Sequence, residues 1–344
     1  MFERLKGSPV KVVEIREGFG ADSLQLAERP EPSPAPEQVV LKMKAFAINY
    51  RDLLVVNGVG RWMPPLRRVP LSDGVGIVVA AGVGVSRVKV GDRVSPIFYP
   101  KWLEGRVAAE KMVHALGGAA ADGLLAEYTV VDEASVVPVP AHLADEEAAT
   151  LPCAGVTAWN ALSSFGDIAP GESVVVLGTG GVSIFALQFA QLRGARVIVT
   201  SSSDQKPARA KKLGAEAGIN YKASPDWPNA IAELTGGAGA DYVVDTVGDL
   251  NKAIAALRPG GRVAFVGLLN GMTAEVDLVT FMGKSCCVEA VDVGSREMFE
   301  AMNKAIAFHV MRPVVDRVFG FFELREALNY LKEARHFGKV CLRA

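Results

Sequence analysis

The sequence predicts an α/β protein of two domains, one mostly β and the other built on a doubly wound parallel sheet. Its 344 residues exceed the roughly 250 to 300 at which a single hydrophobic core stops growing. Half of the residues are hydrophobic and 22% are charged, so the chain can bury two cores. The pattern also changes near residue 173, where a series of short β-type runs gives way to strands that alternate with helices.

Short β-type runs, separated by glycine and proline, occupy the first third of the chain. They predict strands over residues 10–15, 38–47, 76–81, 93–98 and 127–131. Every second residue from Pro30 to Pro36 is a proline, which cannot donate a ladder hydrogen bond, so this stretch predicts an extended connector. Residues 99–123 lack a regular pattern and predict a surface lobe.

After residue 173, apolar strands alternate with helical stretches. Strands are expected over 173–177, 196–200, 242–245 and 262–266, and helices over 181–193, 205–213 and 250–257. Because parallel neighbours need long crossovers, this alternation predicts a parallel sheet with helices on both faces. The end of the chain, which we expect to rejoin the first domain, predicts alternating helices and strands over 295–308, 314–319, 324–335 and 339–342.

Composition argues against several classes of function. Lys and Arg number 37 against 38 Asp and Glu, and they are spread along the chain, so no nucleic-acid footprint is expected. The longest apolar stretches are shorter than the roughly 20 residues of a membrane span. The segment from Met1 to Val10 has no apolar region typical of a leader, which predicts a cytoplasmic location. Four cysteines without Cys-x-x-Cys spacing and four scattered histidines predict no structural zinc.

A glycine loop follows the apolar strand that ends at Leu177. Gly178-Thr-Gly-Gly-Val-Ser183 stands between this strand and an amphipathic helix, which is the context of a dinucleotide fingerprint. Gly178 permits a tight turn, Gly180 lets the backbone approach a pyrophosphate, and the helix N-terminus offers free N–H groups. Ser183 replaces the third glycine and is still small. We expect a dinucleotide site here, with a ligand-free glycine turn as the alternative.

The end of the next strand indicates which dinucleotide binds. An NAD site has an acid there, about 20 residues after the glycines. Here the strand ends in Ser201-Ser202-Ser203, followed by Asp204 and Lys206. Hydroxyls and an ammonium suit a 2′-phosphate, so NADPH is favoured over NADH. In the alternative, the serines form a polar turn and Asp204 reaches back to the ribose of NAD.

Several motifs together carry a family resemblance. They are AINYRDL at 47–53, PLSDGVG at 70–76, VGDRV at 90–94, LPCAGVTAW at 151–159, the glycine loop, and HFGKV at 336–340. With them the whole chain resembles the zinc-independent branch of the medium-chain dehydrogenase/reductases, a quinone oxidoreductase-like group often labelled zinc-type alcohol dehydrogenase-like. The resemblance implies a GroES-like, mostly β catalytic domain from residues 1–152 and 294–344, around a Rossmann NADP-binding domain at 153–293. It also implies a homodimer through edge strands near 284–291.

The zinc-dependent branch of this family differs at three positions. Its Cys, His and Cys ligands correspond to Asn49, Ser72 and Cys153, a poor donor set for Zn²⁺. The four-cysteine structural lobe is also missing from 99–123. No metal is therefore expected, and oxidation of an alcohol becomes the less favoured reaction.

Without a metal, the resemblance points to hydride transfer from the nicotinamide to a quinone, an enone or a similar activated small molecule. The Asn49 amide and the Tyr50 hydroxyl are the candidate catalytic groups, since they could donate hydrogen bonds to charge that develops on a substrate oxygen. Asn49 could instead hold a turn, and Tyr50 could pack; Arg51 and Asp52 suggest a local ion pair. Water is the alternative proton donor. A zinc-dependent alcohol dehydrogenase and a non-catalytic NADP(H)-binding sensor remain alternative functions.

The resemblance also assigns cofactor residues. Thr157 is expected near the nicotinamide, and the closing-strand residue Lys339 is expected to reach the cofactor. The pyrophosphate is assigned to Gly178, Gly180, Gly181 and Val182. The 2′-phosphate is assigned to Ser201, Ser202 and Lys206, and the adenosine end to Tyr221. The strand tips, where the sheet is expected to bind the cofactor, contain Val247, Gly248, Gly267 and Leu268. An apolar substrate pocket, or simple packing, is indicated by Trp62, Met63, Trp102 and Met272.

Overall fold

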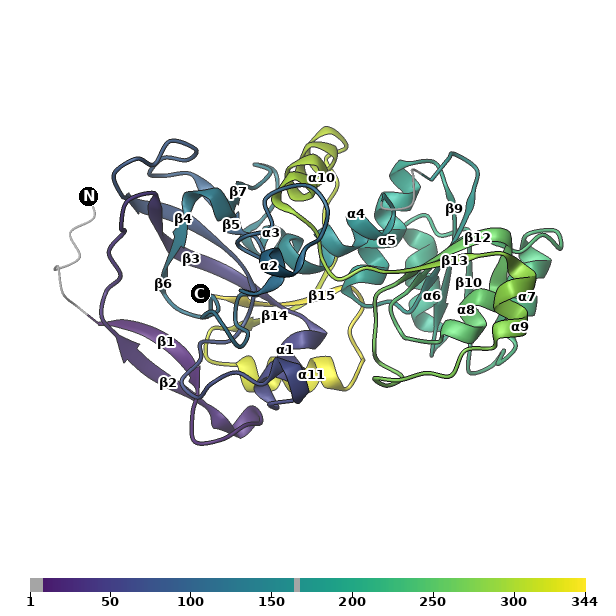
Figure 1. Cartoon of the computed structure of the whole chain (residues 1–344), viewed down its shortest axis with the longest axis horizontal. Coiled ribbons are helices and arrows are strands. Elements are labelled where there is room, and N and C mark those ends of the chain that lie inside the picture. Colours follow the sequence, from purple (N-terminus) through teal and green to yellow (C-terminus); the bar gives the residue numbers. More distant parts are fainter. Residues whose placement is uncertain (1–8, 164–167) are drawn as a thin grey trace. The chain divides into compact units, whose positions relative to one another are not determined.

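The computed structural model describes residues 9–163 and 168–344 (Figure 1). They belong to two compact units, a first unit of Met1–Val156 with Gly294–Ala344 and a second unit of Thr157–Val293. Most of the segment used to predict the absence of a leader, residues 1–8, lies outside the described residues. In the described part of the chain, no helix has both the length and the apolar character that crossing a bilayer requires.

The first unit is built on a seven-stranded sheet and a two-stranded sheet. The larger sheet has the order β14-β15-β3-β4-β5-β7, with β6 paired to β3, and the smaller one pairs β1 with β2. The strands are β1 (Val10–Ile15), β2 (Leu24–Arg29), β3 (Gln38–Ile48), β4 (Asp73–Ala81), β5 (Arg93–Pro96), β6 (Tyr128–Asp132), β7 (Val136–Pro138), β14 (Val315–Gly320) and β15 (Lys339–Arg343). The predicted mostly β character of this part of the chain is confirmed.

Short helices connect and cover these strands. They are α1 (Tyr50–Val56), α2 (Ala109–Met112), α3 (Asp145–Ala149), α10 (Arg296–Phe308) and α11 (Leu324–Lys332), with 3-10 turns at Ala21–Ser23, Gly60–Trp62 and Glu133–Ser135. A π-helical segment, Leu151–Gly155, leads into α4 (Val156–Ala161). The predicted helix over 324–335 is shorter in the structure, because the chain leaves helical geometry at Ala334, which has φ +52°.

The core of the first unit depends on strand β3. Its residues Leu41, Phe46 and Ile48 are at most 1% exposed and pack in one cluster with Val340 and Leu342 of β15. The two strands are antiparallel, with Val340 opposite Ile48. The end of the chain therefore completes the sheet that begins in the first third of the sequence. Lys339, the first residue of β15, lies beside the end of β3.

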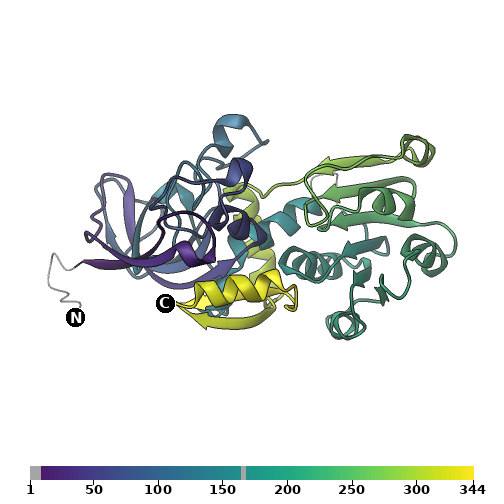
Figure 2. The ribbon, with the colours of Figure 1, turned by 90° about the horizontal axis from the view of Figure 1, so that it is seen from below.

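The second unit is a six-stranded parallel sheet in the order β10-β9-β8-β11-β12-β13. Its strands are β8 (Ser173–Leu177), β9 (Arg196–Ser201), β10 (Ala217–Asn220), β11 (Ala240–Asp245), β12 (Leu257–Phe265) and β13 (Cys287–Ala290). The helices are α5 (Gly181–Leu192), α6 (Gln205–Lys212), α7 (Trp227–Leu234), α8 (Leu250–Ala256) and α9 (Leu278–Lys284), which lie on both faces of the sheet (Figure 2). The predicted doubly wound domain is confirmed.

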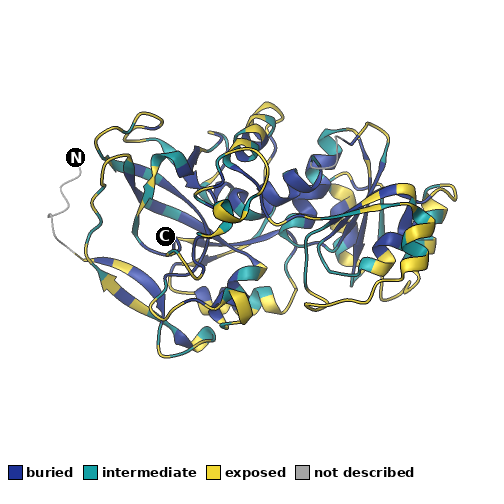
Figure 3. Cartoon of the chain, in the orientation of Figure 1, coloured by how far each residue is buried: buried dark blue, intermediate teal, exposed yellow. Residues whose placement is uncertain are grey.

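The central strand β8 is apolar after its first residue, Ser173. Val174, Val175 and Val176 of β8 are fully buried, as expected for a strand covered on both faces (Figure 3). Strand order reverses between β8 and β11, so the chain crosses to opposite sides after these strands. Ligands of open α/β sheets bind at the carboxyl ends of the strands beside such a reversal, and the glycine loop follows β8 at this point.

Candidate functional site

The loop between β8 and α5 has the conformation that a dinucleotide-binding turn requires. Gly178 has φ +81°, a left-handed backbone that favours glycine, and its N–H donates to Thr200 O at 3.0 Å. Gly180 is the N-cap of α5, and no described side chain caps this helix. The N–H groups of Gly181 and Val182 at its first turn are therefore suited to an anion such as a pyrophosphate.

Ser183, where the fingerprint has its third glycine, adds hydrogen bonds to this loop. Its buried Oγ donates to Leu177 O at 3.0 Å and lies 3.0 Å from Thr246 Oγ1. Thr246 Oγ1 also donates to Leu177 O, at 2.6 Å. The serine thus links α5 to the ends of β8 and β11, which shows how the departure from glycine is accommodated.

Two turns meet closely at the carboxyl ends of β11 and β12. Gly248 has φ +90°, and a Cβ on Gly267 would lie 1.7 Å from a backbone oxygen of the facing turn. The buried Asp245 carboxylate accepts hydrogen bonds from the N–H groups of Val247 and Gly248 at 2.9 and 2.7 Å. Burial raises the pKa of Asp245, although these N–H donors oppose the shift. The structure brings the predicted cofactor residues Val247, Gly248 and Gly267, followed by Leu268, to this pair of turns.

The predicted 2′-phosphate residues lie at the carboxyl end of β9. Ser201 is buried, Ser202 and Lys206 are half-buried, and Tyr221 is 37% exposed. Tyr221 N–H donates to Ser201 O at 3.0 Å, which fixes the turn after β10 beside the end of β9. Lys206 is the second residue of α6, so its position is set by the helix that begins directly after the serines.

Asp204, the acid that would serve an NAD ribose, has a partner of its own. Its Oδ1 accepts a hydrogen bond from Asn220 Nδ2 at 2.8 Å. Asn220 is the last residue of β10. The Asp204 carboxylate is thus held toward the neighbouring strand, an arrangement that favours the 2′-phosphate interpretation.

Thr157, expected near the nicotinamide, is buried at the beginning of the second unit. Its Oγ1 donates to Asp292 O at 2.9 Å, and Asn160 Nδ2 donates to Val293 O at 2.6 Å. Both bonds tie α4 to the segment that follows β13. The role of Thr157 toward a cofactor stays a prediction.

A cluster of buried polar side chains lies at the start of α1 in the first unit. Asn49, Asp52, Asp73 and Lys339 are each at most 8% exposed. Asp52 Oδ2 accepts from Asn49 N–H at 2.8 Å and so satisfies a donor at the start of α1. Lys339 Nζ donates to Ile48 O at 2.6 Å and also to Asn49 Oδ1. Lys339 is therefore directed at the candidate catalytic amide, and its expected contact with the cofactor stays a prediction.

Asp73 is a fully buried acid in this cluster for which the sequence motifs suggested no role. Its carboxylate accepts hydrogen bonds from Ser72 Oγ at 2.7 Å and from Cys153 N–H at 3.2 Å. Burial raises its pKa from 3.8 to about 6, against the lowering effect of the Lys339 charge. The Asn49 amide also favours the charged form of Asp73, although Asn49 Nδ2 has no hydrogen bond of normal geometry among the described residues. An acid at the start of an apolar strand is the sequence signal for such a group.

The raised pKa of Asp73 predicts a specific dependence of stability on pH. The folded protein binds this proton more tightly than the unfolded chain, so the contribution of Asp73 to stability is present below pH 4 and lost as pH rises through about 6. A shift of this size corresponds to about 3 kcal/mol. Asp73→Asn should therefore gain up to about 3 kcal/mol relative to wild type between pH 4 and pH 7. Urea unfolding of both proteins between pH 4 and pH 7 tests this prediction. Free energies of unfolding that depend on pH in the same way for the two proteins would contradict it.

The two candidate catalytic side chains differ in environment. Asn49 Nδ2 is a buried donor without a partner among the described residues, and such a group typically costs about 1–3 kcal/mol. Tyr50 is 42% exposed, so it is not a packed core aromatic. Arg51 Nη1 lies 3.2 Å from Asp52 Oδ1 and donates to Leu116 O at 2.9 Å, which confirms the expected local ion pair. The Asn49 nitrogen thus lies buried near the Asp73 carboxylate, and it makes no hydrogen bond of normal geometry among the described residues.

The three positions that correspond to zinc ligands do not offer a zinc site. Asn49 Oδ1 accepts from the Lys339 ammonium, and Ser72 Oγ donates to Asp73, so both oxygens are engaged. Cys153 would be the one thiolate. Across the described ranges, no group of three or more His, Cys, Asp or Glu side chains could hold a metal ion. Catalytic zinc prefers three nitrogen, sulfur or carboxylate ligands, and these donors do not fit it.

The four residues considered for an apolar pocket have separate environments. Trp102 is 4% exposed, and its Nε1 donates to Gly105 O at 2.9 Å within the predicted lobe. Trp62 packs against the core of the first unit, whereas Met63 and Met272 are about half exposed. The packing alternative therefore holds for both tryptophans.

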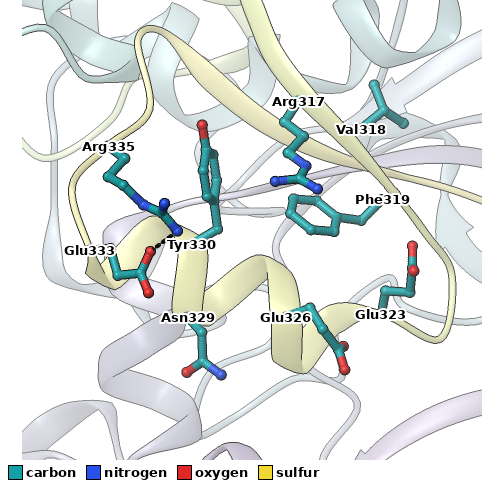
Figure 4. A pocket seen from close by; sticks show the side chains of 9 residues that line it. All are labelled: Arg317, Val318, Phe319, Glu323, Glu326, Asn329, Tyr330, Glu333 and Arg335. Atoms are coloured by element: carbon teal, nitrogen blue, oxygen red, sulfur yellow. Dashed lines mark ion pairs between the residues drawn. The ribbon is translucent and has the colours of Figure 1, made fainter.

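A surface hollow of about 400 Å³ lies apart from these residues, between β14 and α11 (Figure 4). The Arg317 guanidinium stands 4.8 Å from the ring centre of Phe319 and 5.3 Å from that of Tyr330. Glutamates 323, 326 and 333 also line the hollow. None of the predicted site residues lines it, so the hollow adds nothing to the candidate site.

Comparison with known proteins agrees with this geometry. Residues 35–141 match the alcohol dehydrogenase GroES-like domain, and residues 181–307 match the zinc-binding dehydrogenase domain. A zinc-type alcohol dehydrogenase-like protein of Schizosaccharomyces pombe is 40% identical, over 94% of this chain and 96% of the relative.

Two solved structures illustrate the range of chemistry among similar proteins. An NAD-dependent alcohol dehydrogenase is 34% identical with a TM-score of 0.89, over 97% of this chain and 99% of the other. The 2-octenoyl-CoA carboxylase reductase CinF, in complex with NADP and 2-octenoyl-CoA, is 25% identical with a TM-score of 0.86, over 98% and 88%. Two domain models match the chain, one relative covers nearly its whole length, and the solved structures share its fold. The chain belongs to the medium-chain dehydrogenase/reductase family of oxidoreductases, and it is alcohol dehydrogenase-like.

Proposed function

We propose that this chain is a metal-free, NADPH-dependent oxidoreductase that reduces quinones, enones or similar activated small molecules. The observation that carries the proposal is the buried cluster at α1. Where zinc-dependent relatives have ligands, Asn49 Oδ1 binds an ammonium and Ser72 binds a carboxylate. What remains there is an amide donor whose nitrogen makes no hydrogen bond of normal geometry among the described residues, and such a donor suits a substrate carbonyl oxygen better than it suits a metal.

The preference for NADPH rests on the end of β9. Serines stand where NAD enzymes have an acid, Lys206 follows in the first turn of α6, and Asn220 holds the nearby Asp204. A 2′-phosphate would receive hydroxyl donors and a positive charge there. The similar structure of CinF contains NADP together with 2-octenoyl-CoA, and this combination of cofactor and activated alkene supports the proposal.

Bound NADPH supplies the hydride from C4 of its nicotinamide, and the overall reaction consumes the activated alkene, NADPH and a proton to give the saturated product and NADP⁺. The N–H groups at the start of α5 bind the pyrophosphate. The Asn49 Nδ2 donates a hydrogen bond to the substrate oxygen as negative charge develops on it. The hydroxyl of the partly exposed Tyr50, or a water molecule, delivers the proton to carbon.

Steady-state oxidation of NADPH with a panel of quinones, enones and enoyl thioesters tests this function. We expect turnover with at least one class and none with simple alcohols and NADP⁺. Tight NADPH binding without turnover on every compound would favour a sensor. Alcohol oxidation that depends on bound zinc would favour a zinc-dependent dehydrogenase.

Lys206→Ala is expected to weaken NADPH binding about 10- to 100-fold and to leave NADH binding nearly unchanged, because a hydrogen bond to a charged group is worth about 1.5–3 kcal/mol. Fluorescence titration with each dinucleotide measures both dissociation constants. Lys212→Ala is the matched control, since Lys212 is an exposed lysine at the other end of α6. Equal losses for the two dinucleotides would remove the 2′-phosphate role.

A homodimer is proposed through the edge of the second unit. Strand β13 is the last strand of its sheet, and the adjoining helix α9 exposes Leu278, Val279 and Met282 by 64%, 83% and 77%. Such an unpaired edge with apolar neighbours is suited to pairing with a second copy. We expect light scattering to give the dimer mass for wild type and the monomer mass for Val279→Glu combined with Met282→Glu. A monomeric wild type, or a dimer that persists in this variant, would contradict the proposal.

A further inference from the structure

Lys339 is a buried lysine whose ammonium lies inside the first unit. It is 3% exposed and is the first residue of β15. Its backbone N–H donates to Val314 O at 2.9 Å, and its Nζ donates to Ile48 O at 2.6 Å and to Asn49 Oδ1. A lysine ammonium is a donor only, and its burial is unfavourable unless acceptors surround it. These acceptors fix the position of the ammonium at the junction of β3 and α1.

Two buried carboxylates balance this charge. Asp52 on α1 and Asp73 on β4 are both fully buried, and the Lys339 charge lowers the pKa of each, against the larger effect of burial. Arg51 adds a second positive charge on Asp52, at 3.2 Å. The ammonium is therefore bonded to Ile48 and Asn49, and its charge acts on the nearby carboxylates of Asp52 and Asp73.

The ammonium also determines the orientation of the Asn49 amide. An asparagine side chain has one accepting oxygen and one donating nitrogen, which can exchange places by a flip of the amide. In the observed orientation, the Lys339 ammonium donates a hydrogen bond to Asn49 Oδ1. After a flip of the amide, Nδ2 would face the ammonium, and two donors would oppose each other. The flipped orientation is therefore unfavourable, and Nδ2 remains the donor near the Asp73 carboxylate, without a hydrogen bond of normal geometry among the described side chains and backbone.

We propose that Lys339 is a positioning residue that fixes the Asn49 amide with its nitrogen available to the substrate oxygen, and that its charge polarises the amide into a stronger donor. This inference rests on the proposed function of Asn49. It differs from the role expected from the sequence, in which Lys339 reaches the cofactor. The two roles predict different kinetic results.

A cycle of variants separates these roles. Lys339→Met keeps the length of the side chain and removes the charge and the donors. We expect kcat with an enone to fall about 10- to 100-fold, as for loss of a preorganised donor, while the NADPH dissociation constant stays unchanged. In the Asn49→Ala background the same substitution should cause no further loss of kcat. Multiplicative losses in the double variant, or weaker NADPH binding with intact kcat, would overturn the proposal.

A second pair of variants guards against misfolding. Lys339→Met removes the positive charge that lowers the pKa of Asp73, whereas Asp52 keeps its ion pair with Arg51, so Lys339→Met combined with Asp73→Asn is compared with Asp73→Asn alone. The same loss of kcat is expected in this pair, and equal kcat values would overturn the proposal.

Measurements without turnover keep the two claims distinct. A wild type that reduces no compound in the panel overturns the proposed function. Urea unfolding of the Lys339→Met and Asn49→Ala cycle then still decides the contact. Non-additive unfolding free energies are expected if Lys339 holds the amide, and additive values would contradict it.

Discussion

NADPH binding by the Gly180→Val variant is expected to be at least ~100-fold weaker than that of wild type, because each lost charge-assisted hydrogen bond is worth about 1.5–3 kcal/mol. Gly180 has φ −76° and ψ −171°, a conformation open to any residue, so the backbone can accept valine. The branched side chain would instead occupy the space in which a pyrophosphate approaches the N-terminus of α5. Loss of binding should therefore occur in a folded protein.

Fluorescence titration with NADPH measures this effect, and thermal unfolding shows whether the variant is folded. Gly283→Ala is the matched control, since a Cβ at Gly283 meets no heavy atom within 4 Å. Its NADPH affinity should equal that of wild type. An unaltered dissociation constant in a folded Gly180→Val protein would remove the pyrophosphate from this loop.

Asn49→Ala is expected to lower kcat about 10²- to 10³-fold, the usual effect of removing one preorganised donor to a developing oxyanion. NADPH binding should be unchanged, because the N–H groups proposed to hold the pyrophosphate are those at the start of α5, and Asn49 is not among them. Stopped-flow measurement of NADPH oxidation separates the hydride step from product release.

Asn57→Ala provides the control for this variant. Asn57 is the C-cap of the same helix, and its Nδ2 already donates to Leu53 O at 2.7 Å. Its loss should affect stability slightly and kcat hardly at all. Equal kcat values for Asn49→Ala and wild type would leave Asn49 with a purely structural role in α1.

Local patterns predicted much of this fold. The run Val174–Leu177 and the glycines after it identified β8, its turn and α5, because burial on both faces and a tight turn leave clear traces in the sequence. Strand β10 was not predicted, since its residues Ala-Gly-Ile-Asn include glycine and asparagine, which are uncommon in strands, whereas β13 lies within the edge segment 284–291 that the resemblance implied. Helix α7 was missed because Pro228 near its start resembles a loop signal, although proline is tolerated in a first turn.

The buried cluster could not be predicted in the same way. Lys339 and Asn49 are 290 residues apart, and their contact depends on the pairing of β15 with β3. The motif containing Lys339 suggested a residue that faces the cofactor. A single lysine in a sequence does not indicate that its side chain will be buried near two carboxylates. The raised pKa of Asp73 likewise depends on burial, which no local spacing specifies.

The central claim is that reduction here proceeds with an amide donor and without a metal. Zinc analysis of purified protein, combined with enone-dependent NADPH oxidation before and after treatment with a chelator, tests it most directly. We expect no stoichiometric zinc and the same rate in both assays. About one tightly bound zinc per chain, whose removal abolishes activity and whose return restores it, would contradict the account.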